Sequence, residues 1–297
     1  MNQERIARRG QFQGVIVSHC PFGQGYNSLI IRFEGIASVT IAKAQPGQFV
    51  QVACGPAGIT KGTTLRRPFS ISGVTLDGDT TCLEIIYRII GPGTEALANM
   101  SVGDMIDVLA PLGQGFKLPK DPDAKCLLLG GGIGLPPMFF LADRLAQQGV
   151  DRVGFAAARN IEVVQNDIVA EAIVDNPLVP SKAMKHFNAS DTGSIIASDD
   201  GSCGFKGNIL EALEGFLARH PDWNIATMYA CGPEPMLKAL ALFAQAVDME
   251  CQVCMEAYMA CGIGVCQSCA IELAGGERSY KLVCAHGPVF NGREIKW

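Results

Sequence analysis

Four cysteines near the C-terminus constrain this chain more than any other feature of its sequence. The segments CGIGVCQSC and LVC supply them, with gaps of four, two and fourteen residues, as Cys261, Cys266, Cys269 and Cys284. A C-x4-C-x2-C…C arrangement is the spacing with which plant-type ferredoxins hold a 2Fe-2S cluster. Gly262 and Gly264 allow this loop positive φ values and a close approach of backbone N–H groups to sulfur. The sequence therefore predicts a 2Fe-2S cluster with these four thiolates as ligands.

Zinc is the alternative metal for four cysteines, but structural zinc sites generally use two paired CxxC or Cys/His knuckles. A separate CxxC pair, Cys251 and Cys254, lies in the largely apolar stretch CQVCMEA. Such a pair can act as a redox dithiol or as extra metal ligands, but its apolar neighbours favour buried thiols. The other six of the twelve cysteines are scattered and are expected to be small buried residues.

The pattern of apolar runs, glycines and prolines along the chain predicts three domains. Up to about residue 120, short apolar runs such as GVIVSH and LEIIYRII are broken by glycine and proline, which is typical of a small antiparallel barrel or sandwich. Over residues 121–247, buried strands such as CLLLGGG alternate with amphipathic helices such as PPMFFLADRLAQQG, which indicates a parallel α/β sheet. Residues 248–297 are too few to hold a large core, so we expect the cluster to organise a small C-terminal 2Fe-2S domain.

A glycine-rich turn connects the first predicted strand of the α/β domain to its first helix, in the segment LLLGGGIGLPPM. Such a turn lets the backbone approach a pyrophosphate, and the helix N-terminus adds N–H groups and a favourable dipole. Its spacing differs from GxGxxG, so the ordinary dinucleotide fold is not required.

Two segments of the predicted barrel carry residues suited to a flavin nucleotide. In LRRPFSIS, an arginine suits the diphosphate, while proline and phenylalanine offer a flat apolar wall and serine a hydroxyl. In IIYRIIGPGTEAL, a glycine turn with a threonine opens a predicted helix that would hold the second phosphate.

Composition argues against other classes of function. The net charge of −5 comes without a basic stripe, so nucleic acid is not an expected partner. We find no apolar run of the roughly 20 residues that a membrane span needs and no signal peptide core, so a cytoplasmic protein without a membrane partner is expected.

Taken in order, RRPFS, GPGT, LLGGGIGLPPM, YACGPEPML and the four cysteines resemble the ferredoxin-NADP reductase superfamily. Within it, the chain is most similar to the electron transfer subunits of two-subunit bacterial dihydroorotate dehydrogenases. The resemblance implies that FAD binds on the barrel, through Arg67, Pro68, Phe69, Ser70, Ile86, Tyr87, Arg88, Gly93 and Thr94. It also implies that NAD(H) binds at the glycine turn and the CGP turn, through Gly130, Gly131, Gly132, Ile133, Gly134, Cys231, Gly232 and Pro233.

Two departures from the superfamily pattern stand out. Phe69 occupies a position where tyrosine is usual, which keeps the aromatic face but removes one hydroxyl. The loop AGITKGTT before the arginine motif is long, and the sequence offers no account of it. Glu256, just before the cysteine loop, is expected to be a solvated or capping carboxylate.

The resemblance implies an oxidoreductase subunit that moves electrons between NADH, FAD and the cluster. Its partner would be an FMN-containing dihydroorotate dehydrogenase catalytic subunit, in a heterotetramer of two chains of each kind. In pyrimidine biosynthesis the electrons would flow from dihydroorotate towards NAD. A reductase subunit of a hydrogenase, sulfite reductase or bifurcating transhydrogenase is the alternative, and a redox sensor is a third class. NADH is expected over NADPH, because Arg159 has no second basic residue beside it to hold a 2′-phosphate.

Overall fold

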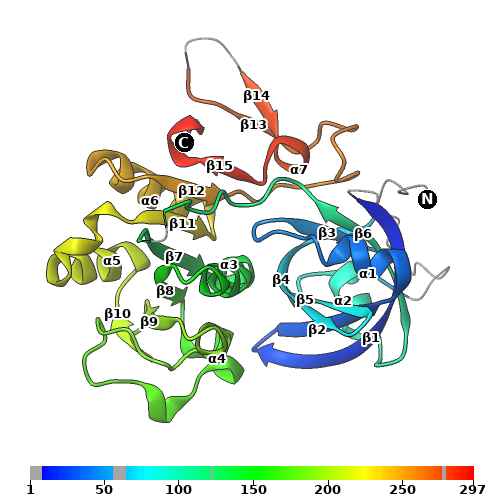
Figure 1. Cartoon of the computed structure of the whole chain (residues 1–297), viewed down its shortest axis with the longest axis horizontal. Helices are drawn as coiled ribbons and strands as arrows, with labels where there is room; N and C mark the ends of the chain where they lie inside the picture. The colour runs from blue at the N-terminus through cyan, green and yellow to red at the C-terminus, as the bar shows by residue number, and fades with distance from the viewer. Residues whose placement is uncertain (1–8, 56–64, 122, 276–278) are drawn as a thin grey trace.

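An antiparallel barrel forms the N-terminal part of the chain in this computed structural model, which describes residues 9–55, 65–121, 123–275 and 279–297. Within those ranges the barrel closes in the order β1-β2-β5-β4-β3-β6, and α1 and α2 cover it (Figure 1). Its elements are β1 (Gly10–Gly23), β2 (Tyr26–Phe33), α1 (Gly35–Ile41), β3 (Phe49–Val52), β4 (Arg67–Asp77), β5 (Thr80–Arg88), α2 (Pro92–Ala98) and β6 (Met105–Leu112). The loop AGITKGTT lies outside the described residues.

The two faces of strand β3 pack against different parts of the protein. Val50 and Val52 are fully buried in the barrel core together with residues of β2, β4, β5 and β6. Because side chains alternate along a strand, Phe49 and Gln51 point to the other side, where Phe49 packs in the large cluster that contains Cys269 and Cys284. The outer face of β3 therefore packs against the cysteine segment.

A mixed sheet, parallel except at one edge, forms the second layer. Its described strands run in the order β10-β9-β8-β7-β11-β12-β15, and β15 pairs antiparallel with β12. They are β7 (Lys125–Gly131), β8 (Asp151–Ala158), β9 (Gly193–Ser198), β10 (Phe205–Lys206), β11 (Thr227–Cys231), β12 (Cys251–Cys254) and β15 (Val289–Asn291).

Helices cover both faces of this sheet, as Figure 1 shows. Leu127 and Leu129 of β7 pack with α5 and α6, whereas Leu128, between them, packs with α3 and α4 on the opposite face. The helices are α3 (Leu135–Gln147), α4 (Lys185–Ala189), α5 (Ile209–Arg219) and α6 (Glu234–Ala246). Short 3-10 turns lie at Gly132–Gly134, Ile161–Val163, Gln165–Asp167, Ala170–Ala172, Pro221–Ile225 and Gly292–Glu294.

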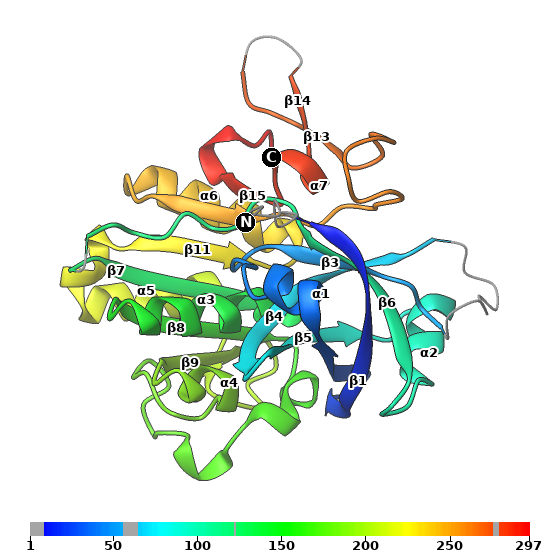
Figure 2. The same cartoon turned by 45° about the vertical axis from the view of Figure 1, so that its right-hand side comes forward.

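The C-terminal segment lies across the barrel and the sheet (Figures 1 and 2). It contains a two-stranded sheet of β13 (Ala270–Glu272) and β14 (Tyr280–Leu282) and the one-turn helix α7 (Val283–His286). The predicted boundary after residue 247 falls between α6 and β12, and β12 and β15 extend the large sheet. The barrel, the α/β sheet and the C-terminal segment agree with the predicted fold class.

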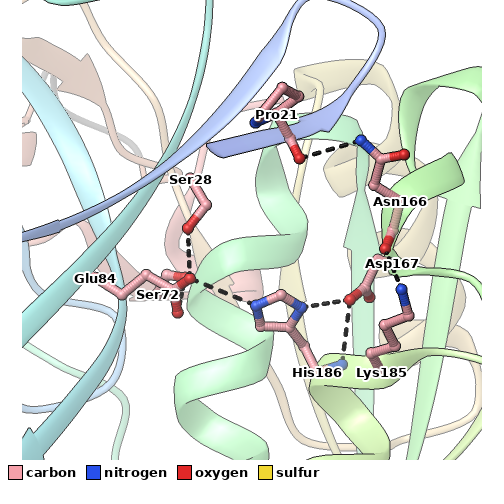
Figure 3. A network of polar contacts seen from close by, with 8 residues as sticks. All are labelled: Pro21, Ser28, Ser72, Glu84, Asn166, Asp167, Lys185 and His186. Atoms are coloured by element: carbon pink, nitrogen blue, oxygen red, sulfur yellow. Dashed lines mark hydrogen bonds and ion pairs between the residues drawn. The ribbon is translucent and has the colours of Figure 1, made fainter. Parts of the chain in front are cut away.

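A partly buried charged network joins the barrel to the sheet (Figure 3). His186 of α4 contacts Asp167 through Nδ1 and lies 3.5 Å from Oε1 of Glu84 in β5 through Nε2. Ser28 and Ser72 of the barrel donate to the Glu84 carboxylate. Burial alone would lower the pKa of His186, but hydrogen bonds and charges from Asp167 and Glu84 outweigh it and raise this pKa to about 10.

Candidate functional site

A cleft of about 870 Å³ lies where the barrel meets the C-terminal segment. One wall comes from the ends of β4 and β5, which pair side by side in the barrel. The other wall comes from the stretch that follows β12, together with Ser268 of the cysteine loop. The predicted FAD residues that line the cleft are Arg67, Pro68, Phe69, Ser70, Ile86, Tyr87, Arg88 and Thr94, joined by Ile133 of the predicted nucleotide set.

The two neighbouring arginines of the RRPFS motif have different surroundings. Arg66 is tied to Asp107 by an ion pair and a hydrogen bond to its carbonyl. Arg67 makes no ion pair among the described residues; its Nη1 donates to the Leu65 carbonyl at 2.7 Å and it faces the cleft. Gly93 lies directly against it, because a Cβ at Gly93 would stand 3.1 Å from Arg67 Nε. This arrangement leaves a cationic group at the cleft wall that suits a diphosphate.

The aromatic and hydroxyl groups of this cleft are held in place by the barrel. Phe69 packs edge-on against Tyr87, with ring centroids 5.7 Å apart. The Tyr87 hydroxyl lies 2.8 Å from Nε2 of His19, and burial raises the pKa of Tyr87 to about 12. Thr94 Oγ1 accepts the N–H groups of Ile90 and Gly91, so this hydroxyl already organises its own turn.

A second cleft, of about 580 Å³, opens at the carboxyl ends of the parallel strands. Of the predicted nucleotide residues, Gly131, Gly132, Ile133 and Pro233 line it. Gly132 has a φ of +55°, and a Cβ on Gly134 would stand 2.1 Å from the Cys231 carbonyl oxygen. The turns after β7 and β11 therefore pack together only because Gly134 lacks a side chain, while Gly132 supplies the positive φ of the first turn.

The remaining predicted nucleotide residues do not line the second cleft but lie in the packed turns that form it. Cys231 and Gly232 form the turn that Gly134 contacts, and a Cβ on Gly130 would stand 2.7 Å from Leu135. Asp199 and Asn208, which no sequence motif marks, line the second cleft at the ends of β9 and β10. Their signal is positional, since ligands bind beyond the carboxyl ends of strands in open α/β sheets.

Three residues belong to both clefts, namely Arg88, Ile133 and Glu256. Glu256 lies two residues beyond the end of β12, and partial desolvation by the surrounding protein raises the pKa of its carboxyl. The Glu256 side chain is exposed, as expected for a solvated carboxylate, and it also lies on the wall that the two clefts share. Groups bound in the two clefts would meet at this wall.

The four predicted cluster ligands form two pairs. Cys266 donates its backbone N–H to Cys261 Sγ at 3.4 Å, and Cys269 Sγ lies 3.3 Å from Cys284 Sγ. Within the ranges that the structure covers, no three histidine, cysteine, aspartate or glutamate side chains converge on one point to hold a single metal ion. Two pairs of thiols suit a cluster of two irons better than one zinc ion.

The surroundings of the cysteine loop also fit a bound cluster. A hydrogen bond with Ser268 and others with Cys261 lower the pKa of the Cys266 thiol to about 6, which favours the thiolate that binds iron. Gln51 of β3 is fully buried against Gly262, and neither of its amide atoms has a hydrogen-bond partner among the described residues. A buried amide without a partner next to the cysteine loop fits a site for a sulfur-rich group that would accept its hydrogen bond.

The second CxxC pair is not part of this loop. Cys251 and Cys254 lie on β12 and are both buried, which confirms the expectation of buried thiols. Burial raises the pKa of Cys251 to about 12. Cys254 borders the first cleft and is in register with Cys231 of β11.

Comparisons with known proteins cover nearly the whole chain. Residues 256–296 match the model of the iron-sulfur cluster binding domain of dihydroorotate dehydrogenase B. The chain is 35% identical to the electron transfer subunit of dihydroorotate dehydrogenase B (NAD(+)) from Desulforamulus reducens, over 86% of this chain and 87% of that one. It is 34% identical to the same subunit from Shouchella clausii, over 97% and 99% of the two chains.

Solved structures give the same architecture. An NADH-dependent reduced ferredoxin-NADP oxidoreductase, studied for flavin-based electron bifurcation, aligns with a TM-score of 0.75 and 25% identity, over 97% of this chain and 91% of that one. The ferredoxin reductase of carbazole 1,9a-dioxygenase aligns with a TM-score of 0.61 and 17% identity, over 81% and 67%, which supports the fold alone. Among the described helices, none has the length and apolar character to cross a membrane.

Proposed function

Because the chain belongs to the family of electron transfer subunits of dihydroorotate dehydrogenase B, we propose that its two clefts and its cysteine loop form one continuous electron path. The family places the protein among NAD-linked iron-sulfur flavoproteins that serve pyrimidine biosynthesis together with a catalytic subunit. When bound, FAD exchanges an electron pair with a nicotinamide and single electrons with a 2Fe-2S cluster. The chain's own residues position these groups.

The observation that carries this proposal is the sharing of walls. Arg88, Ile133 and Glu256 line both clefts, so a nicotinamide bound in the second cleft would lie next to a flavin ring bound in the first. Ser268 lines the first cleft and contacts Cys266 Sγ at 3.2 Å, so the same cleft borders the cysteine loop. Nucleotide, flavin and cluster sites thus follow one another without a gap.

Each cleft residue has a proposed task. Arg67 binds the FAD diphosphate, and Pro68 and Phe69 hold the apolar face of the ring and exclude water. The Ser70 hydroxyl reaches a ring heteroatom. The backbone N–H groups of the turn from Gly130 to Gly134 bind the nucleotide pyrophosphate at the start of α3.

The composition of the second cleft favours NADH. Arg159 is accompanied there by the carboxylate of Asp199. A carboxylate at the end of a parallel strand accepts a hydrogen bond from the ribose 2′-hydroxyl and repels a 2′-phosphate. Asp199→Asn should therefore reduce the preference for NADH over NADPH by roughly tenfold or more.

Initial rates of flavin reduction with each nucleotide measure this preference. Asn208→Ala is the control, because it alters the same cleft without changing its charge. An unchanged NADH preference in Asp199→Asn, or a native preference for NADPH, would contradict the assignment.

The catalytic partner is proposed to carry FMN and to form a heterotetramer with two copies of this chain, and we place the complex in the cytoplasm. Next to the ligand loop, Val265 is 75% exposed and Ile263 37% exposed. Apolar side chains at a cluster loop are better explained by a partner surface than by water.

Removing one cluster ligand tests the path. The purified protein should hold about one FAD and one 2Fe-2S cluster. Cys266→Ser should lose iron and sulfide while NADH still reduces the flavin, because the hydride step lies upstream of the cluster. Iron, sulfide and flavin analysis with stopped-flow absorbance measures both, and the exposed, non-ligand Cys20→Ser is the control. If Cys266→Ser also lost NADH-dependent flavin reduction, the hydride step and the cluster step would not be separable.

A reductase subunit of another redox complex is the second candidate, favoured by the alignment with the bifurcating oxidoreductase. Mixing the protein with a dihydroorotate dehydrogenase catalytic subunit separates the two. Orotate formation coupled to NAD reduction supports the first function, and failure to bind that subunit supports the second.

A further inference from the structure

Gln51 is a buried polar residue that the functions assigned above do not use. It lies on β3 between Val50 and Val52, which fill the barrel core, and it points to the opposite face together with Phe49. Its exposed fraction is 0%. An amide placed so deeply requires hydrogen-bond partners, because an unsatisfied buried donor or acceptor costs about 1–3 kcal/mol.

Within the described part of the chain, neither Nε2 nor Oε1 of Gln51 has such a partner. The other buried glutamine on a strand behaves differently. Gln252 of β12 accepts the Lys117 N–H at 2.9 Å and donates to the Lys117 carbonyl at 2.9 Å. The lack of a partner at Gln51 is therefore a property of its site rather than of buried glutamines in this protein.

The Gln51 amide faces the cysteine loop. A Cβ added to Gly262, the residue that follows Cys261, would stand 2.7 Å from both Cγ and Nε2 of Gln51. Gly262 has a φ of +68°, so the loop turns at the point of contact. Thiol sulfurs and the sulfides of a bound cluster are the acceptors that such a loop brings to an amide.

Gln51 also stands next to the flavin cleft. Its register partner on β4 is Pro68, and Phe49 on the same face of β3 lines that cleft. The amide thus lies between the two predicted redox groups, inside protein, where a hydrogen bond is electrostatically stronger than in water.

We propose that the Gln51 amide donates an N–H hydrogen bond to a sulfur at the Cys261 end of the 2Fe-2S cluster and thereby raises the reduction potential of the cluster. The inference rests on the proposed function, since it requires the cluster. Reduction adds one negative charge to the cluster, so a donor that stays protonated stabilises the reduced form more than the oxidised form. Gln51 acts as a positioning residue: it takes up no electron or proton.

Two substitutions, Gln51→Met and Gln51→Leu, remove the N–H donor and replace the amide with an apolar side chain of similar volume. Each should shift the one-electron equilibrium of the cluster roughly tenfold towards the oxidised form, which lowers the midpoint potential by about 59 mV. Redox titration of the intact protein, followed by the electron paramagnetic resonance signal of the reduced cluster, measures this potential.

Gln252→Met is the matched control, because it also removes a buried glutamine, but one whose amide is paired with the backbone of Lys117. It should leave the potential unchanged and lower the thermal stability of the apoprotein, since it breaks paired hydrogen bonds. Gln51→Met should lower the potential and leave apoprotein stability equal or higher, since it removes two unpaired atoms.

An unchanged potential in Gln51→Met and Gln51→Leu at native iron content overturns the proposal. Loss of the cluster from both variants, with Gln252→Met retaining it, also overturns it, because the role would then be retention. A native protein without iron and sulfide would instead refute the proposed function.

Discussion

At the residue scale, the two adjacent arginines of the RRPFS motif differ in role because they contact different residues. Arg66 is bound to Asp107, whereas Arg67 faces the cleft and packs on Gly93. The motif was recognisable in the sequence. The alternation of side chains along a strand, however, does not predict which of the two arginines contacts the Asp107 carboxylate on β6. That depends on the pairing of β3 with β6, which joins residues far apart in the chain.

Arg67→Ala should weaken FAD binding roughly 10- to 100-fold, because a charge-assisted hydrogen bond contributes about 1.5–3 kcal/mol. Arg66→Ala should instead lower the free energy of unfolding, since it leaves the Asp107 carboxylate without its cation. Flavin fluorescence on dilution and urea titration measure the two effects. If Arg66→Ala loses FAD more readily than Arg67→Ala, the assignment is reversed.

At the element scale, long periodic segments were predictable and short strands were not. The segments behind α3, α5 and α6 show clear amphipathic patterns, and they form helices of 13, 11 and 13 residues. Strand β15 has only three residues, and nothing in VFN indicates that it pairs with β12. Strand β9 also lacks a clear sequence signal, so Asp199 at its end could not be predicted to line the nucleotide cleft.

The cysteine loop, residues 261–269, gives the element-scale prediction. Val265→Glu should weaken binding to the catalytic subunit at least tenfold, or about 1.4 kcal/mol, because it buries a charge in an apolar contact. NADH-dependent flavin reduction should stay unchanged. Leu76→Glu, at 67% exposure and at the opposite end of β4 from Arg67, is the control. Calorimetric titration with the catalytic subunit decides, and equal affinities of the two variants would exclude this docking face.

At the scale of the whole molecule, the site exists only because the barrel and the sheet hold a fixed relative position. The network of His186, Asp167 and Glu84 lies between these two layers (Figure 3). No local pattern reveals it, because its members come from segments distant in the sequence. Burial would raise the pKa of Glu84, but His186 and the two serine hydroxyls together lower it.

The pH dependence of stability follows from these shifts. His186 has a pKa near 6.5 when unfolded and about 10 when folded, so its contribution is complete below pH 6.5 and is lost as pH rises towards 10. Glu84, whose pKa is lowered, contributes above its ordinary pKa and loses this in acid.

His186→Leu should lower the free energy of unfolding at pH 6 by roughly 3 kcal/mol, because Asp167 is left buried without its cation. The fall in stability between pH 6 and 10 should also become smaller. Urea titrations at both pH values measure this. His220→Leu, at the end of α5 and in contact with neither Asp167 nor Glu84, should keep the native pH dependence; an equal loss there would refute the role of the network.

The way in which β12 and β15 pair has a consequence for how such proteins diversify. Cys254 and Val289 are register partners, and the Met255 N–H donates to the Pro288 carbonyl at 2.9 Å. Residues 256–287 thus form a segment that leaves the sheet after β12 and returns at the paired position on β15. The outer residues of this metal-binding segment can therefore change to suit a new protein partner, while the strands of the nucleotide-binding sheet keep their pairing.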